Sequence, residues 1–431
     1  MNILFFGDYR PARNYGSIST TESMIKLIKS VSKDNDIKIV DQRSYYMQTP
    51  KNGFPPFMMD LKKKYSFKKK IYGCAPDSIK KIINKLRNKE ESEIHVPYKL
   101  CMYESYYDDI LKGKRFIFEK ELFDWADIVI FQGEGLLVHG IDRYGKYLIA
   151  GLYQLYMLWL SKFKFKKVTI IVNHTVDTGG NIEANEMIRT IYPHLDLVAV
   201  REPLSLKFLR DLGINNAEYI PDALFSFRPL NNNWSFSSKL TEQIDFSKPY
   251  ICIGDTSGIL NNRYYSGVKW NFVEIYSKII DELKKIIPQI IFVDGFRGIN
   301  NDVNKVIKNN GIGYVNLLNC SYEDLYYVFK ESEIFISGRW HSSILAVLAN
   351  TPILLLGADS YKTKALYDIL DYDAPFFELN TLPIYVEEIV QSTKSILERK
   401  SEIKQKLKVN VEPLIEGAKG NVRFLADWLN N

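Results

Sequence analysis

Short apolar runs alternate along the chain with longer stretches in which apolar residues recur every three or four positions. Runs of four to six apolar residues fit buried strands, whereas the three-to-four spacing fits helices that cover a sheet. This alternation is typical of βαβ units and predicts a parallel sheet. In the first half of the sequence, strands are predicted near residues 3–6, 37–40, 128–131, 168–172, 197–200 and 218–220.

Local signals mark three helices in this half. One is predicted to begin at Ser19, where Glu22 completes a capping box. Another is predicted from Pro203 to just before Gly213, because proline favours a first turn and glycine often follows a helix end. The apolar stretch 147–160 would reach roughly 21 Å as a helix, short of the ~30 Å hydrocarbon core of a membrane, so we expect a buried helix.

The same pattern begins again after the polar stretch 231–248, with strands predicted near 250–253, 290–293, 314–317, 334–337 and 352–355. We therefore expect an α/β protein of two Rossmann-like, doubly wound domains that face a central cleft, as in the GT-B type of glycosyltransferase. The expected domains are residues 1–235 and 246–431, the second with closing helices. The segment 44–121 interrupts the first domain and is expected to be an insertion.

Composition narrows the class of protein. The chain has 431 residues, of which 46% are hydrophobic and 25% charged, and these proportions exclude a largely disordered protein. The four cysteines lie far apart with no CxxC pair, which argues against a zinc module or a disulfide scaffold and suits a reducing compartment. The chain opens with a strand pattern instead of a secretion signal, so we expect a cytoplasmic protein.

Basic residues are concentrated in one segment. The net charge is +6, but residues 61–89 hold eleven basic residues against one acid and carry +10, which leaves −4 for the remaining chain. This imbalance argues against a nucleic-acid partner. The segment fits a solvated charged helix as well as a contact with anionic lipid at the inner face of the plasma membrane, where each lysine or arginine contributes ~1 kcal/mol.

Ligands of open parallel sheets bind beyond the carboxyl ends of the strands, so the residues that follow each predicted strand are candidates for a site. Simpler roles also fit several of them. An aspartate can cap a turn, a pair of serines can cap a helix, and glycines can serve only a tight turn. The candidates are Asn14, Gly16, Ser17, Gly133, Glu134, Gly135, Arg201 and Asp222 in the first half, and Arg339, Trp340, His341, Ser342 and Ser343 in the second.

Two of these positions share one arrangement. Arg201 ends a strand directly before the helix that opens with Pro203, and Arg339 and His341 end a strand before a helix that starts near Ser342. Helix N-termini favour anions, and arginine recognises carboxylate or phosphate with two parallel hydrogen bonds. Facing lobes would bring both arginines to one cleft, which would suit a small ligand with two anionic groups. Neither a GxGxxG nor a GxxxxGK[ST] motif is present, so dinucleotide binding and P-loop chemistry are disfavoured.

In their order and spacing, these motifs resemble the polysaccharide pyruvyl transferase family. The resemblance covers most of the chain outside 44–121. It rests on Asn14 to Ser17, the Gly133 and Gly135 turn, Val198 to Ser205 with Gly213, Ile220 to Asp222, Ser337 to Ser342, Ala346 to Pro352, and Lys362. Family members have two Rossmann-like lobes. They transfer an enolpyruvyl-derived group from phosphoenolpyruvate to a hexose of a cell-surface polysaccharide, as in capsule or exopolysaccharide, and form a pyruvate ketal.

The resemblance implies roles for particular residues. Arg201 and Arg339 would hold the donor, His341 would act as general acid, and Lys362 would screen the phosphate. Ser342, Ser343, Gly133 and Gly135 are assigned with them to donor binding, and Asn14, Gly16, Ser17, Asp222 and Trp340 to the acceptor or another part of the cleft. The implied chemistry needs no metal and no cofactor, with phosphoenolpyruvate as a substrate. The implied partner is a glycan or a lipid-linked oligosaccharide acceptor.

Two positions depart from the family pattern. Trp340, between the arginine and the histidine, would narrow the acceptor site. Glu134 would place a carboxylate beside an anionic donor, or would serve as a base for a sugar hydroxyl.

Two other functions stay open. One is a GT-B glycosyltransferase that uses a nucleotide-activated sugar, with Arg339, Ser342 and Ser343 on the nucleotide phosphates and Glu134 as base. The other is a non-catalytic glycan-binding or scaffolding protein, which would keep its function after His341→Ala. The sequence makes no prediction of oligomeric state.

Overall fold

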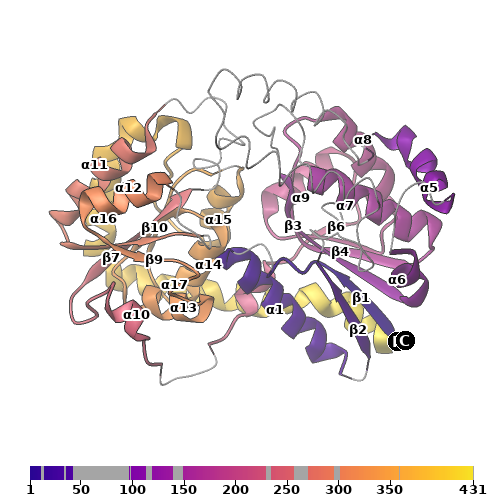
Figure 1. Ribbon diagram of the computed structural model, residues 1–431, viewed down its shortest axis with the longest axis horizontal. Helices are drawn as coiled ribbons and strands as arrows, with labels where there is room; N and C mark the ends of the chain where they lie inside the picture. Colours follow the sequence, from indigo (N-terminus) through magenta and orange to yellow (C-terminus); the bar gives the residue numbers. More distant parts are fainter. Residues whose placement is uncertain are drawn as a thin grey trace, which may run out of the picture.

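Two parallel sheets, each covered by helices, lie side by side in the computed structural model (Figure 1). The α/β class with two doubly wound sheets is therefore confirmed. The basic segment 61–89 and most of 44–121 lie outside the residues that the structure describes. Those are residues 1–10, 14–33, 35–41, 97, 99–112, 119–138, 149–229, 234–256, 270–295, 301–358 and 360–430.

The first lobe is built on a six-stranded sheet in the order β2-β1-β3-β4-β5-β6. Ile3 and Phe5 lie on one face of this sheet, and Leu4 and Phe6 on the other, so each face has its own core. The strands are β1 (Asn2–Phe6), β2 (Asp36–Val40), β3 (Ile128–Val138), β4 (Val168–Asp177), β5 (Leu197–Val200) and β6 (Ala217–Tyr219). One face is covered by α1 (Tyr15–Val31), and the other by α5 (Tyr103–Leu111), α6 (Glu119–Trp125), α7 (Ile149–Trp159), α8 (Ile182–Ile191) and α9 (Pro203–Asp211).

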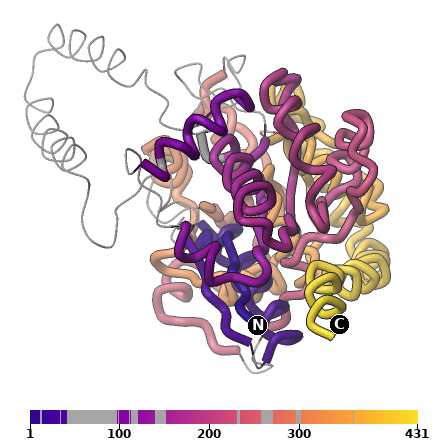
Figure 2. Tube along the Cα trace, turned by 90° about the vertical axis from the view of Figure 1, so that its right-hand side faces the viewer, coloured from indigo at the N-terminus to yellow at the C-terminus, as the bar shows by residue number. Residues whose placement is uncertain are grey.

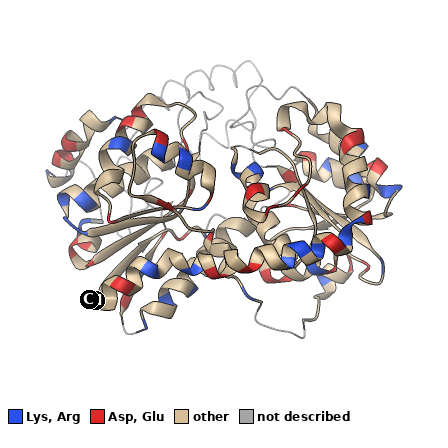
Figure 3. Cartoon of the chain, turned by 180° about the vertical axis from the view of Figure 1, so that it is seen from behind, with Lys and Arg blue, Asp and Glu red and all other residues tan. Residues whose placement is uncertain are grey.

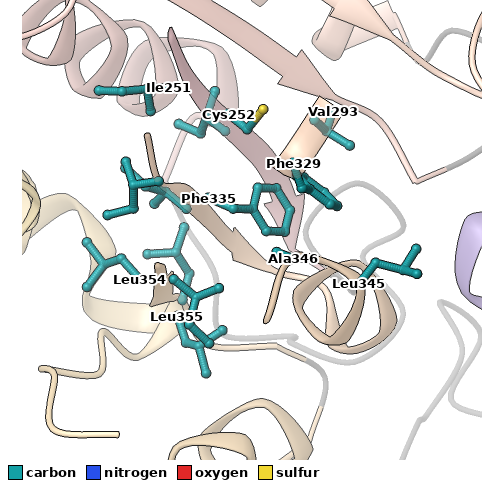
Figure 4. Packing of buried hydrophobic residues seen from close by; sticks show 14 of the residues in the cluster. Ile251, Cys252, Val293, Phe329, Phe335, Leu345, Ala346, Leu354 and Leu355 are labelled. Atoms are coloured by element: carbon teal, nitrogen blue, oxygen red, sulfur yellow. The ribbon is translucent and has the colours of Figure 1, made fainter. Parts of the chain in front are cut away.

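The second lobe repeats this plan with five strands in the order β11-β10-β7-β8-β9. Figure 4 shows its central packing, where Cys252 and Phe335 of neighbouring strands meet Phe329 from a covering helix. The strands are β7 (Tyr250–Thr256), β8 (Gln289–Val293), β9 (Gly313–Val315), β10 (Phe335–Gly338) and β11 (Ile353–Leu355). The helices are α11 (Phe272–Lys284), α12 (Asn301–Asn310), α13 (Tyr322–Glu331), α14 (Trp340–Leu348), α15 (Lys362–Leu370), α16 (Val386–Glu398) and α17 (Lys400–Gly417).

After α17 the chain returns to the first lobe. The short helix η7 (Ala418–Val422) and α18 (Arg423–Asn430) follow, and Val422 and Leu425 are buried in the same core as Ile3 and Met24. The N-terminal and C-terminal residues consequently lie at the same end of the molecule (Figures 1 and 2). The expected second domain, 246–431, thus sends its last helix to the sheet of the first.

Helix α1 begins one turn earlier than predicted. Asn14 is its N-cap, because the side-chain oxygen of Asn14 accepts a hydrogen bond from the Ser17 backbone N–H at 2.7 Å. Ser19 lies inside the helix and bonds to the carbonyl of Gly16, so the predicted capping box at Ser19 is wrong. The early start carries Tyr15 into the second lobe, where its N–H donates to Gly295 O at 3.0 Å and its hydroxyl to Cys320 O at 2.9 Å.

Within the apolar stretch 147–160, residues 149–159 form the buried helix α7, as predicted. Of the helices in the described ranges, none is both long and apolar enough to cross a bilayer. On the face shown in Figure 3, basic and acidic residues are mixed along the helices. The proposed lipid contact through 61–89 stays a prediction.

Candidate active site at the lobe interface

Arg201 is the centre of a buried polar cluster between the lobes. It follows β5 and is 1% exposed. Its Nε donates to Thr175 Oγ1 at 2.9 Å, and its Nη1 donates to Asp222 Oδ2 at 2.9 Å and to Glu134 Oε2 at 3.2 Å. The same Nη1 lies 2.9 Å from His341 Nε2, an atom of the second lobe. The arginine of one strand end therefore meets the histidine of the other.

Arg201 and Asp222 hold each other ionised. Burial opposes the charge of Arg201, but Asp222, Glu134 and Glu202 outweigh it and raise the pKa of the guanidinium. Burial likewise opposes ionisation of Asp222, but Arg201 and His341 outweigh it and hold the pKa of that carboxyl well below its usual range. Arg201 and Asp222 thus form a buried ion pair at neutral pH.

His341 occupies the first turn of α14, where both carboxylates of the cluster face it. Its Nε2 lies 3.4 Å from Asp222 Oδ2 and 3.6 Å from Glu134 Oε2. The first turn of α1 covers the other side of the ring, since a β-carbon on Gly16 would lie only 2.3 Å from His341 Nδ1. Glycine at position 16 is therefore what lets α1 approach the imidazole.

Arg339 is held within its own lobe. It is the N-cap residue of α14, and its Nε donates to Asp255 Oδ1 at 2.7 Å while its Nη2 bonds to the other oxygen of the same carboxylate. The Arg339 side chain is 16% exposed and Asp255 is fully buried. The Ser343 hydroxyl donates to the Arg339 carbonyl at 2.7 Å, and Ser342 is buried in the same turn. The Ser343 hydroxyl thus bonds back to a carbonyl four residues earlier along its own helix.

The glycine turn predicted to follow residue 131 lies inside β3, because pairing with β4 continues through Glu134↔His174 and, after a register irregularity, to Leu137↔Val176. A β-carbon on Gly133 would lie 2.1 Å from His174 Nδ1, so this position accepts only glycine. Burial, assisted by Arg201, lowers the pKa of His174 to about 3, so the ring is neutral. Glu134 adopts a left-handed φ of 49°. This backbone conformation, next to the close packing of Gly133 on His174, places the Glu134 carboxylate in the cluster.

Two cations converge on Gly135. An ideal β-carbon at this position would lie 3.9 Å from Arg201 Nη2 and 3.9 Å from Lys362 Nζ. Lys362 opens α15 in the second lobe, so the two cations come from different lobes. The space in front of Gly135 is therefore suited to an anion.

The structure places Asp222 and Trp340, which were assigned to the acceptor or another part of the cleft, in a buried contact between the lobes. Asp222 is fully buried and accepts the Trp340 indole N–H at 2.8 Å and the Thr20 hydroxyl at 3.2 Å. Trp340 is 3% exposed, and its ring lies 5.6 Å from the Arg201 guanidinium. Both side chains join the lobes to each other. Asn14 and Ser17, also assigned to this side, bond to each other as the cap of α1.

Several helices begin around the cluster. The first turn of α1 contains Gly16, and α9 begins just after Arg201. The first turn of α14 contains His341, and α15 begins at Lys362. Their partial positive ends add to the two cations at Gly135 and favour an anionic ligand. Within the described part of the chain, no group of three or more His, Cys, Asp or Glu side chains is arranged to hold a metal ion.

Solved structures with a similar fold are enzymes of activated sugars and glycosides. A UDP-GlcNAc 2-epimerase from Neisseria meningitidis bound to UDP-GlcNAc is 13% identical, with a TM-score of 0.55 and 100% of both chains covered. A UDP-N-acetylglucosamine 2-epimerase is 11% identical (TM-score 0.56, covering 100% of this chain and 96% of that chain). The spinosyn rhamnosyltransferase SpnG complexed with spinosyn aglycone is 10% identical (TM-score 0.51, 100% of both chains). These likenesses show a two-lobed fold of the GT-B type.

A comparison with protein families identifies the chain more closely. Residues 14–360 match the family model described as polysaccharide pyruvyl transferase. The chain therefore belongs to the polysaccharide pyruvyl transferase family and is a transferase. The matched range includes Arg201, Arg339 and His341, and Lys362 lies two residues beyond it. A search among curated proteins found no match.

Proposed function

We propose that the protein transfers an enolpyruvyl-derived group from phosphoenolpyruvate to a hexose of a cell-surface polysaccharide or of its lipid-linked precursor. The observation that carries this proposal is the convergence of Arg201 Nη2 and Lys362 Nζ on Gly135, beside the imidazole of His341. Phosphoenolpyruvate bears a carboxylate and a phosphate on three carbons, so a small site with cations from both lobes suits it. The family to which the chain belongs supports the same donor class.

The reaction needs one proton donor and one acceptor close to the cationic site. A proton must reach the methylene carbon of the donor to make it a methyl group, which leaves a cationic centre at C2. One sugar hydroxyl attacks C2, the C2–O bond to phosphate breaks, and a second hydroxyl completes the ketal. Of the two hydroxyl protons, one replaces the proton delivered to carbon and the other leaves with phosphate.

The cluster supplies groups for each of these tasks. We assign proton delivery to His341, because an imidazole holds and releases protons near neutral pH. We assign to Glu134, whose Oε2 is 3.6 Å from His341 Nε2, the role of base that accepts a proton from a sugar hydroxyl. Arg201 and Lys362 are assigned to one anionic group of the donor. Arg339, two residues before His341 and with a side chain that is 16% exposed, is assigned to the other.

A matched pair of lysine variants tests the donor. Lys362→Met should raise the Kd for phosphoenolpyruvate about tenfold or more with little change in Tm, because one of the two cations at Gly135 is lost. Lys364→Met, an exposed position of the same helix, is the control and should bind like the wild type. His341→Gln should keep donor binding and lose phosphate release in the presence of acceptor glycan.

Calorimetry and thermal shift with phosphoenolpyruvate and with a panel of nucleotide sugars supply the measurement. Gly135→Ala is a second route to the same result. Its methyl group would meet its neighbours at ordinary contact distances and would occupy the space between the two cations. Stabilisation of the wild type by a nucleotide sugar and not by phosphoenolpyruvate would reject the proposal in favour of a glycosyltransferase.

We further propose that the reaction takes place at the cytoplasmic face of the membrane, where a lipid-linked acceptor would be available. The +10 charge of residues 61–89 supports this location, because clustered lysines are attracted to anionic lipid. Replacing the eleven basic residues with glutamine should abolish co-sedimentation with phosphatidylserine vesicles. Unchanged co-sedimentation of that variant would remove the idea, and neutral vesicles are the control.

A further inference from the structure

Tyr361, directly before Lys362, reaches across the lobe interface. Its hydroxyl donates to the backbone carbonyl of Val176 and lies 3.2 Å from Ser205 Oγ. Val176 lies near the end of β4, and Ser205 lies in the first turn of α9, the helix that follows Arg201. Tyr361 therefore contacts the elements of the first lobe that position Arg201.

The receiving side of this contact is rigid. Ser205 Oγ accepts from the Val176 N–H at 2.8 Å and is also bonded to Glu202, whose other carboxylate oxygen accepts from the Ser205 N–H at 2.7 Å. Burial and the nearby Glu202 raise the pKa of the Tyr361 phenol, so it stays protonated and remains a donor. The hydroxyl of Tyr361 thus meets a fixed acceptor with its own proton.

Tyr361 occupies the N-cap position of α15, and its side chain is directed to the first lobe instead of capping that helix. Lys362, the first residue of α15, extends a long, flexible side chain to Gly135. Ordering such a chain costs conformational entropy, and a fixed backbone at its base reduces the part of that cost met on ligand binding.

We propose that Tyr361 is a positioning residue for donor binding. It holds the start of α15 against the first lobe, so that Lys362 Nζ and Arg201 Nη2 stay on the same side of Gly135. This role rests on the proposed function, because it assumes that these two cations bind an anionic group of phosphoenolpyruvate. Tyr361 itself does not touch the donor; it acts through Lys362.

A double-mutant cycle separates this role from a general stabilising one. Tyr361→Phe removes a single hydroxyl and keeps the ring. It should weaken phosphoenolpyruvate binding about fivefold, the factor that corresponds to one net hydrogen bond. If Tyr361 acts through Lys362, the variant with both Tyr361→Phe and Lys362→Met should bind no more weakly than Lys362→Met alone.

The matched control is Tyr367→Phe. Tyr367 lies on the same helix, and its hydroxyl accepts a hydrogen bond from the Leu355 N–H at 2.6 Å within the second lobe. This control removes a buried tyrosine hydroxyl that does not cross between lobes. It should leave donor affinity unchanged whatever it does to Tm.

Calorimetry with phosphoenolpyruvate on the full chain, together with Tm for each variant, decides the matter. Wild-type affinity in Tyr361→Phe, or losses that multiply in the double variant, would overturn the role of Tyr361 while Lys362→Met still shows that the donor site is real. If the wild type does not bind phosphoenolpyruvate, the proposed function and this role are both wrong. The two failures are therefore distinguishable.

Discussion

The two arginines that end strands before helices have different surroundings. Arg201 is 1% exposed and shares its Nη1 among two carboxylates and the histidine of the other lobe. Arg339 is 16% exposed and donates two side-chain hydrogen bonds to one carboxylate, Asp255, in its own lobe. The two sites have the same order of strand, arginine and helix, and differ in which lobe supplies their partners.

This difference indicates a division of labour. The partners of Arg201 come from both lobes, so the geometry of the cluster forms only when the two lobes are packed together as in this structure. Arg339 is preorganised by Asp255, a carboxylate of its own lobe, and its side chain is partly exposed. Arg201 therefore belongs to the joint between the lobes while its Nη2 faces Gly135, whereas Arg339 is fixed by a carboxylate of its own lobe.

Removing the carboxylate partner of each arginine tests this contrast most strongly. Asp222→Asn should lower the free energy of unfolding by about 3–5 kcal/mol, because it leaves a buried guanidinium short of one counter-charge. Asp255→Asn should cost about 1–2 kcal/mol, because water can replace part of the lost pairing at the more exposed Arg339. Urea unfolding monitored by circular dichroism measures both. Equal losses would show that the two arginines are not distinguished by the lobe interface.

The fold was predictable because the sheets are buried on both faces. Strands such as β7 read as continuous apolar runs, and Pro203 and Gly213 mark the ends of α9 as expected. The approach of Arg201 to His341 could be anticipated, because residues after parallel strands collect at one edge of a sheet. The sequence indicated neither the tight approach of Gly16 to His341 nor the contact of Gly133 with His174.

The errors share a physical cause, which is that they concern contacts made between distant segments. Ser19 and Glu22 have the spacing of a capping box, but Asn14 begins the helix earlier and places Tyr15 in the second lobe. Trp340 was assigned to the acceptor or another part of the cleft, and the sequence did not indicate that its indole donates to a buried carboxylate of the other lobe. Tyr361 had no motif to mark it, because its partners are a backbone carbonyl and a serine hydroxyl far away in the sequence.

The protonation of Glu202, next to Arg201, gives a further test of the comparison between the two arginines. Its expected effect on stability is smaller. Burial, only partly offset by Ser205 and Arg201, raises the pKa of Glu202 to about 7. The folded protein then holds a proton on Glu202 that the unfolded chain has released, so stability should fall as pH rises from about 4.5 to 7. Glu202→Gln stays neutral throughout and keeps an oxygen that can accept from the Ser205 N–H.

The measured quantity is the free energy of unfolding of the wild type minus that of Glu202→Gln, from pH 5 to pH 8. This difference should decrease by on the order of 2–3 kcal/mol with rising pH. The neutral His174 is present in both proteins, so its own pH dependence cancels. A difference that stays constant or increases with pH would contradict the raised pKa of Glu202.

The return of α18 to the first sheet has a consequence for synthesis of the protein. The face of that sheet around Ile3 and Met24 gains Val422 and Leu425 only after some four hundred further residues have left the ribosome. A nascent first lobe therefore exposes an apolar surface throughout translation of the second, and chaperones would have to protect it. The core of the first lobe is therefore complete only once the end of the second half has been synthesised.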